Sequence, residues 1–174
     1  LCNLRMHSEF RIALKHVLAV GFSTGMKMSA QHIHVGHASR PMRIMGYMRM
    51  VGARLAVRGV PTFMVEAKPG QSFAELTRMG LGRAKGMVAF CTAEYGAGYE
   101  TFRELEYAHD KELLLIPIRL CEVWPPAPTD NERGTWQNKL VFTNGLVYID
   151  DQRMQNAEGV ADQIADSVEH LGVF

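Results

Sequence analysis

From about residue 31 the chain alternates between two patterns of apolar residues. Short apolar runs rich in β-branched residues predict strands. These runs cover residues 32–36, 60–65, 86–91, 113–120 and 140–149. Apolar residues three or four positions apart predict helices between the first four strands and after the last one. Alternation of this kind is typical of an α/β fold, in which helices cover both faces of a parallel sheet.

The predicted helices have recognisable ends. They cover about residues 39–58, 72–84 and 99–110 (or 101–110), and a last stretch with Val160, Ile164, Val168 and Leu171 on its apolar face. The first begins at Ser39 and Pro41 and stops before Gly59. The second begins with Ser72-Phe-Ala-Glu75, a capping box in which Ser72 and Glu75 each satisfy a backbone amide of the other.

Two stretches fall outside this alternation. In residues 1–30, apolar residues at helical spacing predict a helix from about Ser8 to Val20, followed by a linker from Gly21 to Ser29. We therefore place a domain boundary near residue 31. Residues 122–138 are polar and rich in proline, and predict a long loop. A loop of this length in a compact domain is usually functional or mobile.

Composition excludes several classes of function. Of 174 residues, 47% are apolar and 21% are charged, which fits one globular domain. The net charge is +1 and no basic stripe is present, so we expect no nucleic-acid partner. Cys2, Cys91 and Cys121 are too few and too scattered for a disulfide framework, which favours reduced thiols in a cytoplasmic protein. No apolar run is long enough to cross a membrane, so we expect no membrane partner either.

Common α/β motifs are missing or incomplete. No P-loop follows a predicted strand. Gly96-Ala-Gly98 precedes a predicted helix, but Thr101 stands where a dinucleotide fingerprint has its third glycine. A receiver domain would have an aspartate where the third predicted strand ends, and this chain has Phe90-Cys91-Thr92. These classes are therefore disfavoured.

A histidine cluster raises the question of a metal site. His32, His34 and His37 lie close together, and alternation along a strand puts His32 and His34 on one face. No cysteine or carboxylate lies nearby in sequence to complete a tetrahedral set of ligands. We therefore favour partly buried histidines at the end of a strand, and predict no metal.

A series of segments in a fixed order carries a family resemblance. They are residues 54–73 with Gly70 in a turn, Ala84–Tyr95, Glu104-Leu-Glu-Tyr-Ala108, Ile116-Pro-Ile118 and Asn144-Gly-Leu-Val-Tyr148. In order and spacing, these segments resemble the TIR (Toll/interleukin-1 receptor) domain family. The resemblance covers about residues 31–174 and also accounts for Pro117 inside a strand.

The resemblance implies a fold and a place for a ligand. The fold is a three-layer, flavodoxin-like sheet of five parallel strands in the order 2-1-3-4-5, with helices on both faces. In such sheets ligands bind beyond the carboxyl ends of the strands, where the strand order reverses. Here the crevice would be built from residues 36–40, 66–71 and 92–104. Partners would be other TIR domains or further copies of this chain, in signal transduction of the innate-immune kind.

TIR domains fall into two functional classes, and the resemblance leaves both open. Some are scaffolds that assemble with other TIR domains. Others cleave NAD⁺, a substrate and not a cofactor, to nicotinamide and linear or cyclic ADP-ribose. The enzymes resemble one another in a Trp-x-x-x-Glu pattern on a helix, whose glutamate maps to Glu104. The tryptophan position holds Glu100, which is a departure, and Tyr99 or Phe102 is the aromatic residue nearest to it.

The resemblance assigns roles to further residues. Glu104 would be the catalytic carboxylate, stabilising the charge of an oxocarbenium-like transition state. His37, Ser39, Arg40 and Phe63 would line the substrate pocket, with Arg40 on the pyrophosphate. The other positions assigned to substrate binding are Gly70, Tyr99 and Glu100.

Each of these residues also has a structural explanation. Thr101-Phe-Arg-Glu104 is itself a capping-box sequence, so Glu104 could serve only to cap a helix. Arg40 could be solvated, Phe63 could belong to the core, and Gly70 could be a turn glycine. Two functions therefore remain, an NAD⁺-cleaving enzyme active when assembled and a non-catalytic TIR adaptor. A flavodoxin-like ligand-binding domain of another kind is a third.

Overall fold

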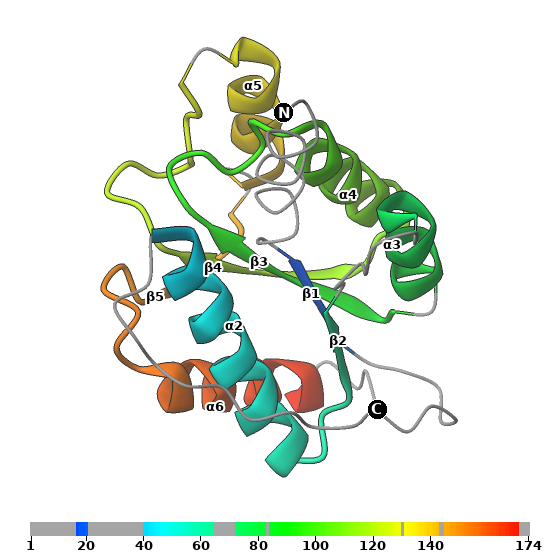
Figure 1. Ribbon diagram of the computed structural model, residues 1–174, viewed down its shortest axis with the longest axis vertical. Helices are drawn as coiled ribbons and strands as arrows, with labels where there is room; N and C mark the ends of the chain where they lie inside the picture. The colour runs from blue at the N-terminus through cyan, green and yellow to red at the C-terminus, as the bar shows by residue number, and fades with distance from the viewer. Residues whose placement is uncertain are drawn as a thin grey trace, which may run out of the picture.

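The structure, a computed structural model, has a mixed α/β fold (Figure 1). It describes residues 17–20, 40–64, 72–82, 84–129, 131–142 and 145–170. In chain order the elements are β1 (Val17–Val20), α2 (Arg40–Val57), β2 (Thr62–Met64), α3 (Phe73–Leu81), β3 (Gly86–Cys91), α4 (Tyr99–Asp110), β4 (Leu114–Arg119), α5 (Glu132–Phe142), β5 (Ile149–Asp150) and α6 (Ala157–His170). Helices α2 and α6 lie on one side of the sheet, and α3, α4 and α5 lie on the other (Figure 1).

The sheet is mixed and not fully parallel. Its strands lie in the order β2-β1-β3-β4-β5. Strands β3, β4 and β5 pair in parallel, with Val88 opposite Ile116 and Ile118 opposite Ile149. Strand β1 is antiparallel to both of its neighbours, so the expected sheet of five parallel strands is wrong in the part of the chain that the structure describes.

The strand between β2 and β3 is not the predicted one. It is Val17–Val20, which the sequence analysis placed at the end of a helix. A short apolar run fits a buried strand as well as a helix, and here pairing with two neighbours decides for the strand. The predicted strand at 32–36 lies outside the described residues. A strand from the first thirty residues thus joins the sheet, and the boundary near residue 31 stays a prediction.

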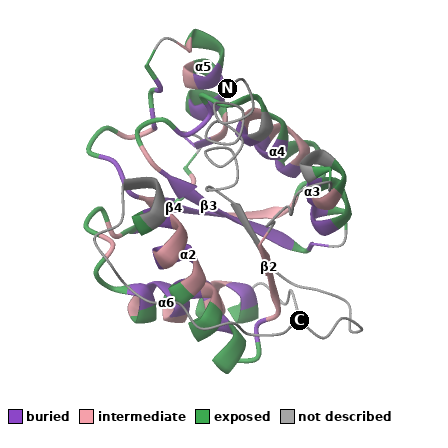
Figure 2. Ribbon diagram, viewed as in Figure 1, coloured by how far each residue is buried: buried purple, intermediate pink, exposed green. Residues whose placement is uncertain are grey.

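Strand β3 divides the hydrophobic core into two halves. All six of its residues are buried, as Figure 2 shows. Because side chains alternate along a strand, Val88 and Phe90 face α2 and α6, while Met87, Ala89 and Cys91 face α3, α4 and α5. Cys91, at the carboxyl end of β3, therefore faces the layer of helices that contains α4.

Several predicted helices are confirmed. Helix α2 buries Met48, Val51 and Leu55 completely, on the expected apolar face. Ser72 is the N-cap of α3, and its Oγ accepts a hydrogen bond of 3.3 Å from the backbone amide of Glu75. Helix α6 is confirmed as well. Within the described ranges, none of the helices combines the length and the apolar character that crossing a bilayer requires.

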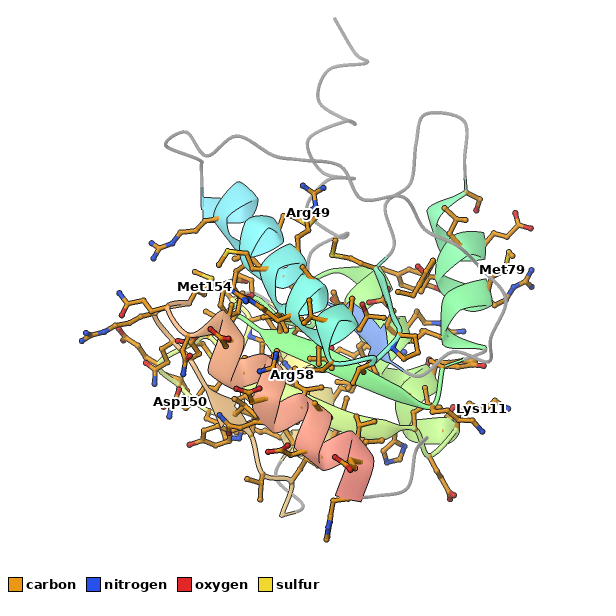
Figure 3. The ribbon with its side chains drawn as sticks, turned by 90° about the horizontal axis from the view of Figure 1, so that it is seen from below. Arg49, Arg58, Met79, Lys111, Asp150 and Met154 are labelled. Carbon is orange, nitrogen blue, oxygen red and sulfur yellow. The ribbon has the colours of Figure 1, made fainter. Side chains whose placement is uncertain are left out.

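Several polar contacts join α2 to the segment that follows β5. The Tyr47 hydroxyl donates a hydrogen bond of 2.5 Å to Oδ2 of Asp151, just after β5. The carboxylate of Asp151 also accepts from the backbone amides of Gln155 and Asn156, at 3.1 and 2.9 Å, ahead of α6. Figure 3 shows Arg58 between α2 and α6, where it forms an ion pair with Asp162.

Helix α5 corrects two predictions together. Residues 132–142 are helical, although the sequence analysis predicted a loop to residue 138 and a strand from residue 140. The strand is reduced to β5, two residues long. The buried residues of α5 are Gly134, Gln137, Asn138 and Phe142, and only the last is a large apolar residue. Because the buried face is polar, the sequence contains no apolar pattern that would indicate this helix.

Candidate functional site

The position of Glu104 on α4 excludes one explanation of this residue. Helix α4 begins at Tyr99, after Gly98 as its N-cap. A capping-box glutamate must lie three residues after the N-cap, and Thr101 occupies that position here. The Thr101 hydroxyl instead donates a 2.9 Å hydrogen bond to the carbonyl of Gly98. Glu104 lies in the second turn, so the interpretation of Thr101 and Glu104 as a capping box is wrong.

Glu104 is also one of the most buried charged residues that the structure describes. Only 4% of it is exposed. Carboxylates are rarely buried to this degree unless their surroundings hold them. Glu104 is followed by Leu105 and Ala108, which pack in the core half that contains Cys91. Glu104 therefore lies on the buried side of α4, together with Leu105 and Ala108.

Tyr95 is a polar residue whose pKa is shifted by the charge of Glu104. It is completely buried and lies four residues after the end of β3. Burial raises the pKa of the Tyr95 hydroxyl well above its usual value, and the charges of Cys91 and Glu104 raise it further. The phenol is therefore neutral at physiological pH. A neutral phenol carries no negative charge and so does not compete with a carboxylate for a positive charge.

Helix α5 and the loop before it hold the turn between β3 and α4. Glu94 accepts hydrogen bonds from the hydroxyl and the backbone amide of Thr129, at 2.9 and 3.2 Å. The side-chain amide of Asn131 donates to the carbonyl of Ala97 at 2.9 Å. That of Asn138 donates to the carbonyl of Tyr95 at 2.7 Å. The turn that leads into α4 is thus fixed from outside its own segment, by residues that the sequence analysis did not single out.

A row of aromatic rings connects this region to β5. Tyr148 and Trp124 have ring centroids 4.7 Å apart, Trp124 and Phe142 are 5.3 Å apart, and Phe142 and Tyr95 are 5.9 Å apart. The guanidinium of Arg119 lies 5.5 Å from the centre of the Tyr148 ring. The aromatic rings packed in a row with Tyr95 therefore come from the stretch after β4, and not from Tyr99 or Phe102.

The predicted substrate-binding residues are described only in part. His37, Ser39 and Gly70, like His32 and His34 of the histidine cluster, lie outside the described residues. Arg40 is the first residue of α2 and Glu100 the second of α4, and their side chains lie outside the described part as well. Of the three expected walls of the crevice, the structure describes only residues 92–104, apart from the side chain of Glu100.

Two of the predicted residues can be placed with their side chains. Tyr99 is 71% exposed at the start of α4. The half-buried ring of Phe63 lies against α3, where a Cβ added to Gly80 would come within 2.4 Å of its Cε1 atom. Phe63 therefore serves at least as a packing residue between β2 and α3.

Comparison of the chain with protein-family models, with curated proteins and with solved structures found no match in any of the three.

Proposed function

We propose that this protein is a TIR-type signalling protein that cleaves NAD⁺ to nicotinamide and linear or cyclic ADP-ribose when it is assembled. The observation that carries the proposal is Glu104, a carboxylate buried in the second turn of α4.

Cleavage of NAD⁺ requires one correctly positioned carboxylate. The bond between C1′ of the ribose and the pyridinium nitrogen breaks, and its electron pair leaves with neutral nicotinamide. Positive charge develops on the ribose, as in glycoside hydrolysis. A carboxylate in a low-dielectric site stabilises this charge more strongly than one in water. Water then adds to C1′ and releases a proton, or a nucleophile of ADP-ribose itself adds and gives the cyclic product.

The neighbours of Glu104 suit this role. Burial raises the pKa of Tyr95, so its phenol stays protonated and adds no negative charge of its own. The row of Trp124, Phe142 and Tyr95 supplies aromatic surface in the same layer. The main observation against the proposal is the departure from the family pattern at Glu100, because no tryptophan precedes Glu104 by four residues.

The test is nicotinamide release from NAD⁺ by the purified full chain, followed by chromatography over a range of protein concentrations. We expect turnover that rises more steeply than protein concentration, because the active form is an assembly. Absence of nicotinamide at every concentration, including with a crowding agent, would refute the enzymatic proposal.

A second function, the non-catalytic adaptor, is favoured by the surface of α5. Trp136 is 66% exposed and Leu140 is 44% exposed. They lie four residues apart, so they are neighbours on one face of the helix. Exposed large apolar residues that adjoin one another are typical of protein-binding surfaces. Self-association without nicotinamide release would favour this function.

A further inference from the structure

Three side-chain amides of α5 and of its N-cap bond the backbone on both sides of the start of α4. They are Asn131, Gln137 and Asn138, which we call the amide clamp. Asn131 donates to Ala97 O at 2.9 Å, Asn138 to Tyr95 O at 2.7 Å, and Gln137 to Phe102 O at 3.0 Å. Two of the bonds lie before the N-cap Gly98 and one lies after it.

Asn138 is the central member of the amide clamp. It is completely buried, and its Nδ2 also donates to the carbonyl of Pro126 at 3.0 Å. One amide group therefore ties the turn after β3 to the loop after β4. Gly96 has a φ of +87°, and a Cβ there would come within 3.1 Å of the same Nδ2 atom. The turn and the amide are therefore packed tightly against each other.

We infer that the amide clamp positions Glu104, with Asn138 as its principal positioning residue. The inference rests on the proposed function of Glu104 and adds how that carboxylate is placed. Glu104 lies six residues after the N-cap, so its position depends on where α4 begins. A shift of one residue along a helix moves a side chain by about 1.5 Å and turns it by about 100°. Misplacement of a catalytic group by about 1 Å can cost about 100-fold in rate.

The deciding variant is Asn138→Leu, which keeps the size of the side chain and removes both donors without adding charge. Gln163→Leu on α6 is the control for the chemical change, because it also removes an amide that donates to a backbone carbonyl, here the exposed bond to Gly159 O at 3.3 Å. Two quantities are measured in the full chain, the amide hydrogen exchange of residues 96–102 and the kcat and KM for nicotinamide release.

We expect Asn138→Leu to speed exchange at residues 96–102 while β3 and α6 exchange as before. We expect its kcat to fall by about 100-fold and its KM to change by less than about 3-fold. Unchanged exchange, or faster exchange with an unchanged kcat, would overturn the inference. A fall in kcat accompanied by an equal fall in Gln163→Leu would do the same.

Failure of the proposed function gives a different result. If the unaltered chain releases no nicotinamide, the exchange of residues 96–102 decides alone whether the amide clamp holds the start of α4. If Asn138→Leu does not fold, Asn131→Asp takes its place. That change keeps the Oδ1 atom that accepts from Gly134 at 2.8 Å, and it replaces the donor to Ala97 by a negatively charged oxygen that repels the carbonyl. It should change the exchange of residues 96–102 and kcat in the same directions, at about one tenth of the size. If neither quantity changes, the inference is contradicted.

Discussion

The hydroxyl of Tyr47 and the carboxylate of Asp151 lie 2.5 Å apart and join the middle of α2 to the start of α6. The ring of Tyr47 is buried and packs edge-on against Phe90 of β3, with centroids 6.0 Å apart. Asp151 is at the same time the acceptor for two backbone amides before α6. One carboxylate therefore organises the layer on the far side of the sheet from α4.

Tyr47→Phe should destabilise the protein by about 1 to 2 kcal/mol, because it removes a hydrogen bond to a charged acceptor in a partly buried place. Urea unfolding followed by circular dichroism measures this change. Tyr99→Phe is the control, since the same atom is removed from a residue that is 71% exposed. Equal effects of the two variants would show that the bond to Asp151 adds no stability.

Alkaline pH should destabilise the protein. Burial, the hydrogen bond to Asp151 and the charge of Asp151 raise the pKa of Tyr47, and burial is the first cause of the raised pKa values of Cys91 and Tyr95. Above the ordinary tyrosine pKa of 10.0 the unfolded chain therefore binds fewer protons than the folded one. Stability consequently falls as pH rises.

The size of this pH effect can be tested at Tyr47. Each proton held only by the folded state contributes a slope of about 1.4 kcal/mol per pH unit. Between about pH 10 and pH 11, Tyr47→Phe should lose stability less steeply than the unaltered chain, by up to that slope. Parallel curves of unfolding free energy against pH would mean that Tyr47 titrates alike in both states.

Replacement of either of two helix glycines by alanine should change stability, but in opposite directions. A Cβ on Gly134 would lie 2.4 Å from the backbone oxygen of Gly96, whereas a Cβ on Gly46 would meet nothing within 4 Å. Gly134→Ala should therefore destabilise by about 1 to 3 kcal/mol through overpacking. Gly46→Ala should stabilise by about 0.5 to 1 kcal/mol through helix propensity. Thermal unfolding of both variants measures the contrast, and stabilisation by Gly134→Ala would mean that α5 does not press on the turn.

The apolar face of α5 should support assembly. Trp136→Gln and Leu140→Gln are expected to weaken self-association by at least about tenfold each, since buried aromatic and aliphatic anchors carry much of the binding energy of interfaces. Sedimentation velocity over a range of protein concentrations measures this. Val147→Gln is the control, because Val147 is 86% exposed and lies on a different segment. Equal effects of all three substitutions on self-association would show that this face of α5 is not the surface through which copies of the chain associate.

Much of the fold was predictable because its core is apolar at regular spacing. Strand β3 was predicted with its observed bounds, since its residues form one unbroken apolar run apart from Gly86. The N-cap of α3 was predicted from Ser72 and Glu75. Where the local sequence and the packing favour the same structure, sequence reasoning gives the element correctly.

The rest depends on contacts between distant segments. Helix α5 buries Gln137 and Asn138, whose partners lie 35 and 43 residues away, so nothing local indicates that these polar residues face inward. Strand β1 is a strand because it pairs with β2 and β3. Glu104 was a candidate from the sequence, but only the observed start of α4 at Tyr99 shows that it is not a cap.

The most direct test of the proposed function compares nicotinamide release by the unaltered chain, Glu104→Gln and Glu106→Gln. Glu106 lies two residues further along α4, is half-buried, and pairs with Arg103 at 2.5 Å, so it controls for the loss of one carboxylate from the same helix. We expect kcat to fall by at least about 100-fold in Glu104→Gln and by less than about 2-fold in Glu106→Gln, with both proteins folded. Equal turnover of Glu104→Gln and the unaltered chain would show that Glu104 is not the catalytic carboxylate.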